Sequence, residues 1–503
     1  MTLERYTDIL ILGCDLPGLI AGAFLAKRGL SVSVLKFPEK NYFQQKNLQP
    51  SLVSHLHTRL FKTILGRLSI ADSELGVTQR ASTPYQIILP GHRIDVSIFR
   101  ERFYRELQRE FKDQTDLLKN FYLKLDQLDL SVDSERLQQS LFPRGFLDRI
   151  KWWQFVKNYH LDFTLSDGLQ DTPQHLELRC LIEAQAKFLT SFYSEELFAY
   201  PLAKLLANEN YALYEVKGGI DHLKQVFLNK IESYSGKIIT DFKLEKLIWR
   251  RRKVIGADLG SLDGLLKCRF MIFNQFQEKL IPYLPQNFFG RWNARKLTVN
   301  KPKFVKMSLH YKVDEQVVPV GMKNHVLWVK NPSEILIGNN FLHLYFLSAE
   351  KSECSQRDLI VTYQIPVESL EREESFFESL HQEITIALYE LMPFSQGKLV
   401  LCFPKPSRED GDDTVSEEVP DYTIFRSGAF SRPVYEARAS KFFHLFPFLH
   451  RPAFYQNLIF SGSEVLSVLG LEGDLMLGLK TTDLVWNEFE GSQKRAIRQR
   501  NIA

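Results

Sequence analysis

The sequence has little of what marks a metal-bound, disulfide-bonded or membrane-spanning protein. It contains five cysteines in 503 residues, and no two of them form a C-x-x-C pair. This spacing argues against a zinc site and a disulfide framework, so we expect reduced thiols and no metal. No apolar run reaches the roughly 18 residues that a transmembrane helix requires. The first apolar run is short and follows charged residues, which argues against a signal peptide, so we expect a cytoplasmic protein.

An excess of charge of one sign is also lacking. The 64 basic and 60 acidic residues leave a formal net charge of +4, which gives no case for nucleic-acid binding. Hydrophobic residues make up 44% of the chain, as in a globular protein. Because the length exceeds that of one typical core, we expect two interlocked domains.

One segment, residues 442–455, combines many aromatic residues with basic neighbours. The interpretation that we favour is a buried loop around a substrate cavity. The alternative is peripheral contact with a membrane, so a membrane-associated location stays open beside the cytoplasmic one.

Local patterns predict several further elements. His55 and His57 fall in the predicted helix over 51–70, and for both we expect a hydrogen-bonded or surface role rather than metal ligation. The predicted elements are a helix over 51–70, a hairpin over 85–96, a helix over 100–113, a mostly helical region over 115–210, strands over 238–249, 303–311, 325–329 and 342–347, and a long helix over 371–391.

The N-terminal segment carries the strongest motif. Ile9–Leu12 is a short apolar run typical of a buried parallel strand. Gly13 and Gly18 occupy the first and third glycine positions of G-x-G-x-x-G, and residues 31–35 return as a second strand. This is the pattern of the βαβ unit that holds a dinucleotide pyrophosphate at a helix N-terminus.

Two positions depart from that pattern. Asp15 replaces the middle glycine, which normally lets the backbone approach the pyrophosphate, and it adds bulk and negative charge there. Lys36 follows the second strand, where a carboxylate commonly binds the adenosine ribose. Lysine cannot accept a hydrogen bond but could pair with a 2′-phosphate. A βαβ unit without any ligand is the alternative interpretation.

Two later segments contribute related features. Gly218 and Gly219 precede an amphipathic helix. The pattern of residues 457–480 predicts a buried strand, a turn at Gly462 and a glycine-flanked helix that begins near Gly470. A helix N-terminus of this kind offers free N–H groups to an anionic or carbonyl oxygen.

The three segments, in this order, resemble the phytoene desaturase and amine oxidase group of FAD-dependent oxidoreductases. The resemblance implies an α/β fold with an α+β substrate domain, in which an FAD-type Rossmann domain is interleaved with a substrate and cap domain. It also implies the following division: FAD-binding parts at 1–100, 213–276 and 441–503, a mainly helical cap at 101–212, and a substrate domain at 277–440.

The resemblance further assigns residues to the parts of FAD. They are Gly13, Asp15 and Gly18 at the pyrophosphate; Lys36 at the adenosine ribose; Leu244, through its backbone, at the adenine; Gly462 and Ser463 near the ribityl chain and pyrophosphate; and Gly470, Leu471 and Gly473 at the flavin ring. Beyond Asp15 and Lys36, two further positions differ from the family: Ser463 replaces an aspartate, and Asp474 replaces a small residue.

The implied function is hydride transfer from an apolar small-molecule substrate to FAD. The aromatic-rich region at 150–200 motivates the apolar substrate. The sequence shows no recognisable catalytic side chain, which fits the family because the flavin itself accepts the hydride. Two alternatives stay open. One is a flavin-less, non-catalytic descendant that acts in binding or assembly, motivated by the altered cofactor positions. The other is an NADP-dependent oxidoreductase that uses Lys36.

Overall fold

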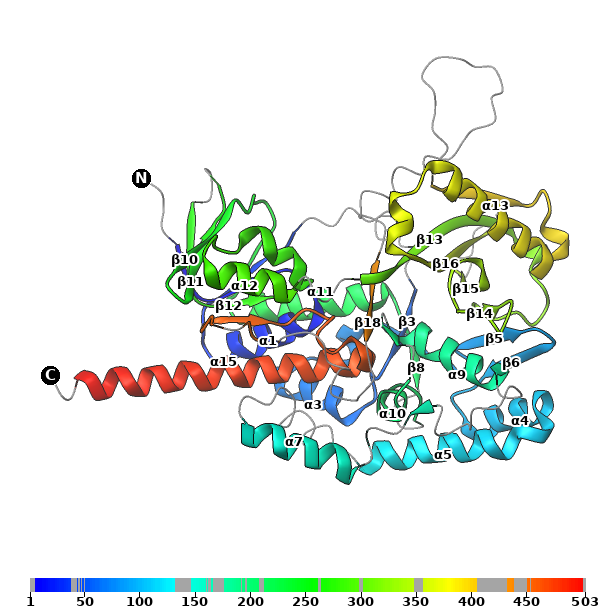
Figure 1. Cartoon of the computed structure of the whole chain (residues 1–503), viewed down its shortest axis with the longest axis horizontal. Helices are drawn as coiled ribbons and strands as arrows, with labels where there is room; N and C mark the ends of the chain where they lie inside the picture. The colour runs from blue at the N-terminus through cyan, green and yellow to red at the C-terminus, as the bar shows by residue number, and fades with distance from the viewer. Residues whose placement is uncertain are drawn as a thin grey trace, which may run out of the picture.

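The structure, a computed structural model, consists of two lobes joined by helices (Figure 1). One lobe contains the N-terminal strand and the other the strands of the chain's middle part. The described residues are 5–37, 43, 46, 48, 50–131, 146–159, 161, 164–165, 176–190, 192–194, 197–207, 212–260, 264–297, 302–347, 356–404, 432–437, 450–452 and 454–500.

A seven-stranded sheet forms the core of the first lobe. Its order is β10-β11-β12-β1-β2-β9, with β19 paired to the end of β12. The strands β12, β1, β2 and β9 run parallel, whereas β10 and β11 form an antiparallel hairpin. Residues Ile9–Leu12 of β1 have no exposed surface, which explains the unbroken apolar run in the sequence. The bounds are β1 Arg5–Leu12, β2 Val32–Leu35, β9 Lys237–Ile239, β10 Lys246–Arg250, β11 Lys253–Asp258, β12 Leu265–Phe273 and β19 Leu458–Phe460.

Helices cover this sheet. α1 (Leu16–Lys27) packs against α11 (Gly219–Ser233) and the long α15 (Gly470–Arg500). A Cβ atom on Gly478 of α15 would lie 2.8 Å from the Cβ of Ile20, so a glycine is what permits this close approach. α3 (Arg59–Leu68) and α12 (Phe288–Leu297) also belong to this lobe, and α15 runs along its side in Figure 1.

A nine-stranded sheet forms the second lobe. Its order is β6-β5-β14-β15-β16-β13-β18-β7, with β17 beside β13. One face packs on α13 (Glu374–Leu391), and the other packs on α9 (Leu176–Leu189). The bounds are β5 Tyr85–Leu89, β6 His92–Val96, β7 Phe192–Ser194, β13 Pro302–Asp314, β14 His325–Val329, β15 Phe341–Phe346, β16 Gln356–Pro366, β17 Leu399–Phe403 and β18 Arg432–Ala437.

Four further helices and a small sheet complete the described part of the fold. The helices are α4 (Arg100–Glu110), α5 (Thr115–Ser131), α7 (Phe146–Asn158) and α10 (Ala199–Leu206). The small sheet has the order β3-β8-β4, with β3 at Leu52–Ser54, β4 at Val77–Arg80 and β8 at Leu213–Val216.

The predicted α/β class with a Rossmann-type sheet is confirmed. So are the hairpin at 85–96, the strands at 303–311, 325–329 and 342–347, and the long helix near 371–391. The hairpin pairs with β14 of the second sheet, although the sequence grouped it with the first FAD-binding part.

Two local predictions were wrong in part. Residues 51–70 are not one helix, because Leu52–Ser54 pairs with Leu213–Glu215 and only Arg59–Leu68 is helical. Residues 238–249 are not one strand, because β9 ends at Ile239 after pairing with β2, and β10 starts at Lys246 in a hairpin with β11. Within the part of the chain that the structure describes, no helix is both long and apolar enough to cross a membrane.

Candidate functional site

Three parallel strands end together at one edge of the first sheet. The register pairs Leu12 with Phe273 and Phe273 with Phe460. The residues that follow these strands therefore meet at the same edge, although they are hundreds of positions apart in sequence. Ligands of open α/β sheets bind at this carboxyl edge.

Asn274, the residue after β12, organises the turn between β1 and α1. Its amide nitrogen donates to the carbonyl oxygens of Gly13 at 3.3 Å and Asp15 at 2.7 Å. Its side-chain oxygen accepts from the amide of Gly18 at 3.0 Å. Gly13 has φ +103°, a conformation that favours glycine, and a Cβ there would lie 2.3 Å from the Asn274 carbonyl oxygen. The glycine turn predicted from the sequence is therefore present and is fixed by a residue that the prediction missed.

Asp15 and Ser463 meet across this edge. The backbone amide of Ser463 donates to Oδ2 of Asp15 at 3.1 Å. The Ser463 hydroxyl donates to Oδ2 of Asp474 at 3.2 Å. The structure thus brings together two residues from distant segments that the family resemblance had placed at or near the pyrophosphate. An amide that could donate to a phosphate oxygen donates to the carboxylate of Asp15 instead.

Two further carboxyl groups lie close to Asp15. Glu464 is only 2% exposed; its Oε1 accepts from the amide of Gln277 at 3.1 Å, while its Oε2 is buried without a partner among the described residues. Burial, with Asp15 nearby, raises the pKa of Glu464 well above its ordinary value. The same two causes raise the pKa of Asp474 well above its own. Both groups are therefore driven toward the neutral, protonated form.

The substitution Glu464→Gln is expected to flatten the dependence of stability on pH. A carboxyl whose pKa is raised in the folded state contributes stability that is fully present below its ordinary pKa, 4.5, and is lost as the pH rises through the raised value. Glutamine keeps the shape and cannot ionise. We expect the thermal midpoint of the variant to exceed that of the wild type at pH 8 by about 1–3 °C, as for about 1–3 kcal/mol in a chain of this length, with little difference at pH 4.5.

Unfolding scans between pH 4.5 and pH 9 measure this effect. Glu490→Gln, on α15 where the side chain is 44% exposed, is the matched control and should follow the wild-type curve. Parallel curves for Glu464→Gln and the wild type would show that ionisation of Glu464 does not limit stability.

The predicted adenosine contacts lie farther along the same edge. Lys36 follows β2, and its backbone amide donates to the carbonyl oxygen of Ile239 at 2.9 Å. Leu244 is half-buried in the loop between β9 and β10 rather than in a strand, and it packs against the core of the first lobe. Beside it, Phe37 and Phe242 make an edge contact with ring centroids 5.0 Å apart.

The start of α15 forms the other end of the candidate site. A Cβ on Gly470 would lie 3.0 Å from Leu205 of α10 and 3.1 Å from the carbonyl oxygen of Leu189 at the end of α9. A Cβ on Gly473 would lie 2.3 Å from the carbonyl oxygen of Leu466. Leu471 is 9% exposed. These glycines therefore allow close packing of protein atoms around the helix start, while Gly462 lies similarly close to Glu464 and Gln275.

A buried polar cluster adjoins this helix start. Lys204 Nζ lies 2.6 Å from Asp129 Oδ1, and both side chains are less than a tenth exposed. Tyr200 lies beneath Lys204, with the cation 5.6 Å from its ring centroid. Burial, and then the charges of Asp129 and Glu472, raise the pKa of Tyr200 well above its ordinary value. The phenol therefore stays protonated and able to donate a hydrogen bond.

His55 completes this cluster. It is fully buried with φ +63°, and its Nε2 lies 2.7 Å from the Lys204 carbonyl oxygen. Because a carbonyl only accepts, Nε2 carries the proton and Nδ1 accepts from the Ser54 hydroxyl at 2.6 Å. The expected hydrogen-bonded role is thus confirmed for His55.

Sequence reasoning missed Asn274, Tyr200 and Lys204. Asn274 had a usable signal, because a polar residue directly after a buried parallel strand falls at the ligand-binding edge. Tyr200 and Lys204 had none, since the other members of the cluster, Asp129 and His55, lie far away in sequence.

Solved structures share this architecture. An oxidoreductase from Methanosarcina mazei superposes with a TM-score of 0.58 at 13% identity, over 96% of this chain and 100% of that one. A triple mutant of putrescine oxidase, made to redesign cofactor binding, gives 0.53 at 14% identity over 97% and 100%. Cyclohexylamine oxidase from Brevibacterium oxydans gives 0.51 at 14% identity over 96% and 99%. No family model and no curated protein matches the sequence. At these identities the likeness establishes the fold alone.

Proposed function

We propose that this chain is an FAD-dependent oxidoreductase that transfers a hydride from an apolar small molecule to the flavin. The observation that carries the proposal is the meeting of Asp15 and Ser463 at the carboxyl edge of the sheet. It brings the β1–α1 turn and the segment before α15 to the place where this architecture binds a dinucleotide. The solved structures of the same fold include an oxidoreductase and two amine oxidases.

The backbone of this edge fits the pyrophosphate of FAD. The positive φ of Gly13, the N-terminus of α1 and the amide of Ser463 are the parts that a pyrophosphate needs, and its binding would require Asp15 to release the Ser463 amide and Asn274 to release the Gly18 amide. Lys36 and Leu244 would lie toward the adenosine, and Gly462 toward the ribityl chain. Gly470, Leu471 and Gly473 would face the ring. FAD, when bound, would supply the hydride acceptor.

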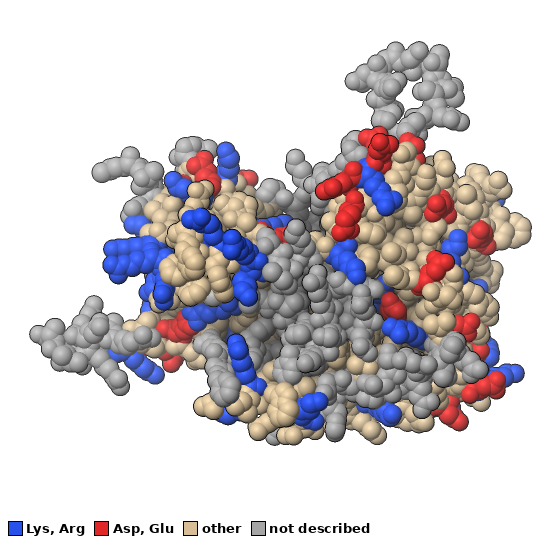
Figure 2. All heavy atoms as spheres, viewed as in Figure 1, with Lys and Arg blue, Asp and Glu red and all other residues tan. Residues whose placement is uncertain are grey.

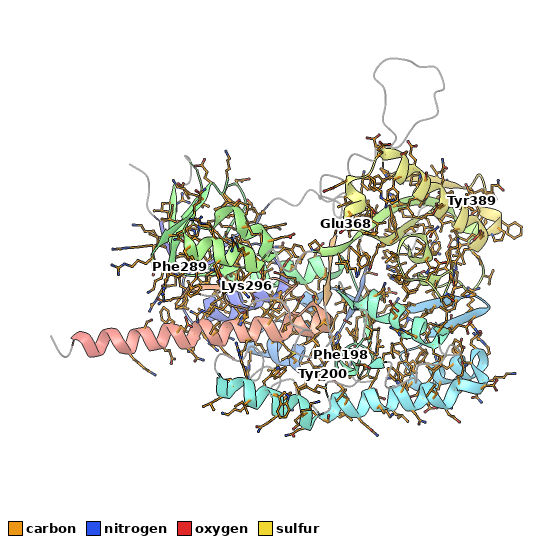
Figure 3. The ribbon with its side chains drawn as sticks, viewed as in Figure 1. Phe198, Tyr200, Phe289, Lys296, Glu368 and Tyr389 are labelled. Carbon is orange, nitrogen blue, oxygen red and sulfur yellow. The ribbon has the colours of Figure 1, made fainter. Side chains whose placement is uncertain are left out.

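The chain's own residues would exclude water and orient the substrate at the ring end. Phe198 and Tyr200, at 4% and 0% exposure, lie at the beginning of α10. Figure 3 shows both close to the N-terminal end of α15. An apolar substrate suits this aromatic surrounding. The proposal includes the division of the chain into FAD-binding parts at 1–100, 213–276 and 441–503, a cap at 101–212 and a substrate domain at 277–440.

The absorbance spectrum of the purified protein tests the cofactor directly. We expect flavin bands between roughly 350 and 500 nm, which bleach anaerobically when the substrate reduces the flavin. Candidate substrates are apolar amines, lipids and polyenes. A colourless protein that takes up no FAD on reconstitution would contradict the proposal.

The substitution Asp15→Gly is expected to tighten FAD binding about 10- to 100-fold. The carboxylate of Asp15 and a phosphate oxygen would compete for the same Ser463 amide, and one charge-assisted hydrogen bond is worth about 1.5–3 kcal/mol. Titration of the deflavinated protein with FAD, followed by flavin fluorescence, measures the affinity. Asp15→Asn, which removes only the charge, should lie between, and Asp483→Asn on the surface of α15 should not differ from the wild type.

A flavin-less binding or assembly protein is the second candidate function. It is favoured by the way in which Asp15 and Asn274 already satisfy the amides of Ser463 and Gly18. Binding of FAD by Asp15→Gly but not by the wild type would support this candidate and exclude the first. Thermal stabilisation by NADP and not by FAD would instead favour an NADP-dependent enzyme that uses Lys36.

A further inference from the structure

The first lobe carries a surface patch of aromatic and basic side chains around α12. The aromatic members are Phe288, Phe289 and Trp292 of α12 together with Phe454. Phe288 is 69% exposed and Phe454 is 39% exposed. Exposed phenylalanines next to one another are unusual on a surface that faces only water.

The aromatic rings of this aromatic–basic patch contact one another. The ring centroid of Phe454 lies 4.9 Å from that of Phe289 and 5.2 Å from that of Trp292. Phe288 stands 5.7 Å from Phe289. The patch therefore joins a helix and a segment more than 150 residues later in sequence, so that it is a property of the folded lobe rather than of one exposed loop.

Cations surround these rings. The guanidinium of Arg252, from the turn between β10 and β11, lies 5.4 Å from the ring centroid of Phe289. The ammonium of Lys296 lies 5.3 Å from that of Trp292. Arg251, Lys253 and Arg291 are exposed at the same turn and helix. Figure 2 shows Lys and Arg side chains gathered over this lobe, whereas acidic side chains are more frequent on the other lobe.

The fold positions α12 so that one side of the helix is buried and this patch faces outward. Gly290, Asn293 and Leu297 are buried on the inner side of the helix. Figure 3 shows Phe289 and Lys296 on the same lobe of the molecule. The turn that carries Arg252 is tied to the second element of the patch, because the amide of Gln456 donates to the Arg252 carbonyl oxygen at 3.0 Å.

We propose that the aromatic–basic patch binds the surface of a membrane rich in anionic lipids. The cations match the negative headgroups, and the exposed rings match the boundary between headgroups and acyl chains, where aromatic side chains are stable. A nucleic acid fits less well, because the rings contact one another and the cations, and so do not present separate faces on which bases could stack. This binding does not depend on whether FAD is bound.

Vesicle co-sedimentation tests the proposal. The full chain should bind vesicles of 70% phosphatidylcholine and 30% phosphatidylserine but not vesicles of phosphatidylcholine alone. Binding should weaken in about 1 M salt, where the Debye length falls to about 3 Å. Each cation near an anionic surface contributes about fivefold in affinity, so Arg291→Glu/Lys296→Glu should weaken binding at least about 25-fold.

Matched variants distinguish binding through the patch from nonspecific electrostatic and hydrophobic binding elsewhere on the surface. Arg105→Glu/Lys112→Glu reverses two exposed cations near α4 and should bind like the wild type. Phe288→Ser should weaken binding about tenfold, whereas Leu147→Ser, at an apolar position of α7 with 71% exposure, should not. Circular dichroism and the thermal midpoint confirm that each variant is folded.

Three outcomes would overturn the proposal. One is equal binding to neutral and anionic vesicles. Another is unchanged binding after Arg291→Glu/Lys296→Glu. The third is binding of a single-stranded oligonucleotide through the same residues without any binding to vesicles.

Discussion

Asn274→Ala is expected to lower the free energy of unfolding by about 3–5 kcal/mol. The side chain has no exposed surface and bonds to Gly13, Asp15 and Gly18. Removing it leaves two carbonyls and one amide without these partners, and each unsatisfied buried group costs about 1–3 kcal/mol, partly offset when water enters. Denaturant unfolding followed by circular dichroism measures the change. Asn229→Ala, at an exposed position of α11, should alter stability by less than about 0.5 kcal/mol.

A double-mutant cycle with Gly18 tests whether the loss comes from this contact. A Cβ on Gly18 would lie 2.2 Å from Cγ of Asn274, so Gly18→Ala must displace the asparagine. Gly18→Ala should therefore cost much less in the Asn274→Ala background than alone, with a coupling of about 1–3 kcal/mol. Additive effects of the two substitutions would show that Asn274 does not hold the turn in solution.

The third glycine of the motif thus has a role that the sequence could not reveal. By itself the spacing of Gly13 and Gly18 indicates a strand, a turn and a helix, because these elements follow from neighbouring residues. The reason for Gly18 is a side chain more than 250 positions away. The apolar runs of β1, of β19 and of the last four residues of β12 were predictable for the same local reason, whereas their common edge depends on the register between them.

The wrong predictions have a similar origin. Leu52 and Val53 continue the helical spacing of the residues after them, but backbone pairing with β8 holds them in a strand. The alternation over 238–249 continues through residues 240–245, which belong to neither β9 nor β10. Asp15 is the instructive case, because its departure from glycine was visible in the sequence but its bond to the Ser463 amide was not.

Lys204→Met is expected to destabilise the protein by about 3–5 kcal/mol, the cost of removing one partner of a buried ion pair. The ammonium lies 2.6 Å from Asp129 Oδ1 at the contact between α10 and α5, and neither side chain is more than 9% exposed. Without Lys204 the carboxylate of Asp129 loses this opposite charge in an environment that water barely reaches. Denaturant unfolding at pH 7 measures the loss.

Two further variants identify its cause. In Lys204→Met/Asp129→Leu both charges are absent, so most of the stability should return, because a well-packed apolar pair often replaces a buried ion pair without loss. Lys494→Met breaks an exposed pair with Glu490 at the far end of α15 and should cost less than about 1 kcal/mol. Because α10 packs on the segment that leads into α15, the single variant should also retain less FAD than Lys494→Met. A double variant as unstable as Lys204→Met would show that packing of the lysine stem, and not the ion pair, holds α10 in place.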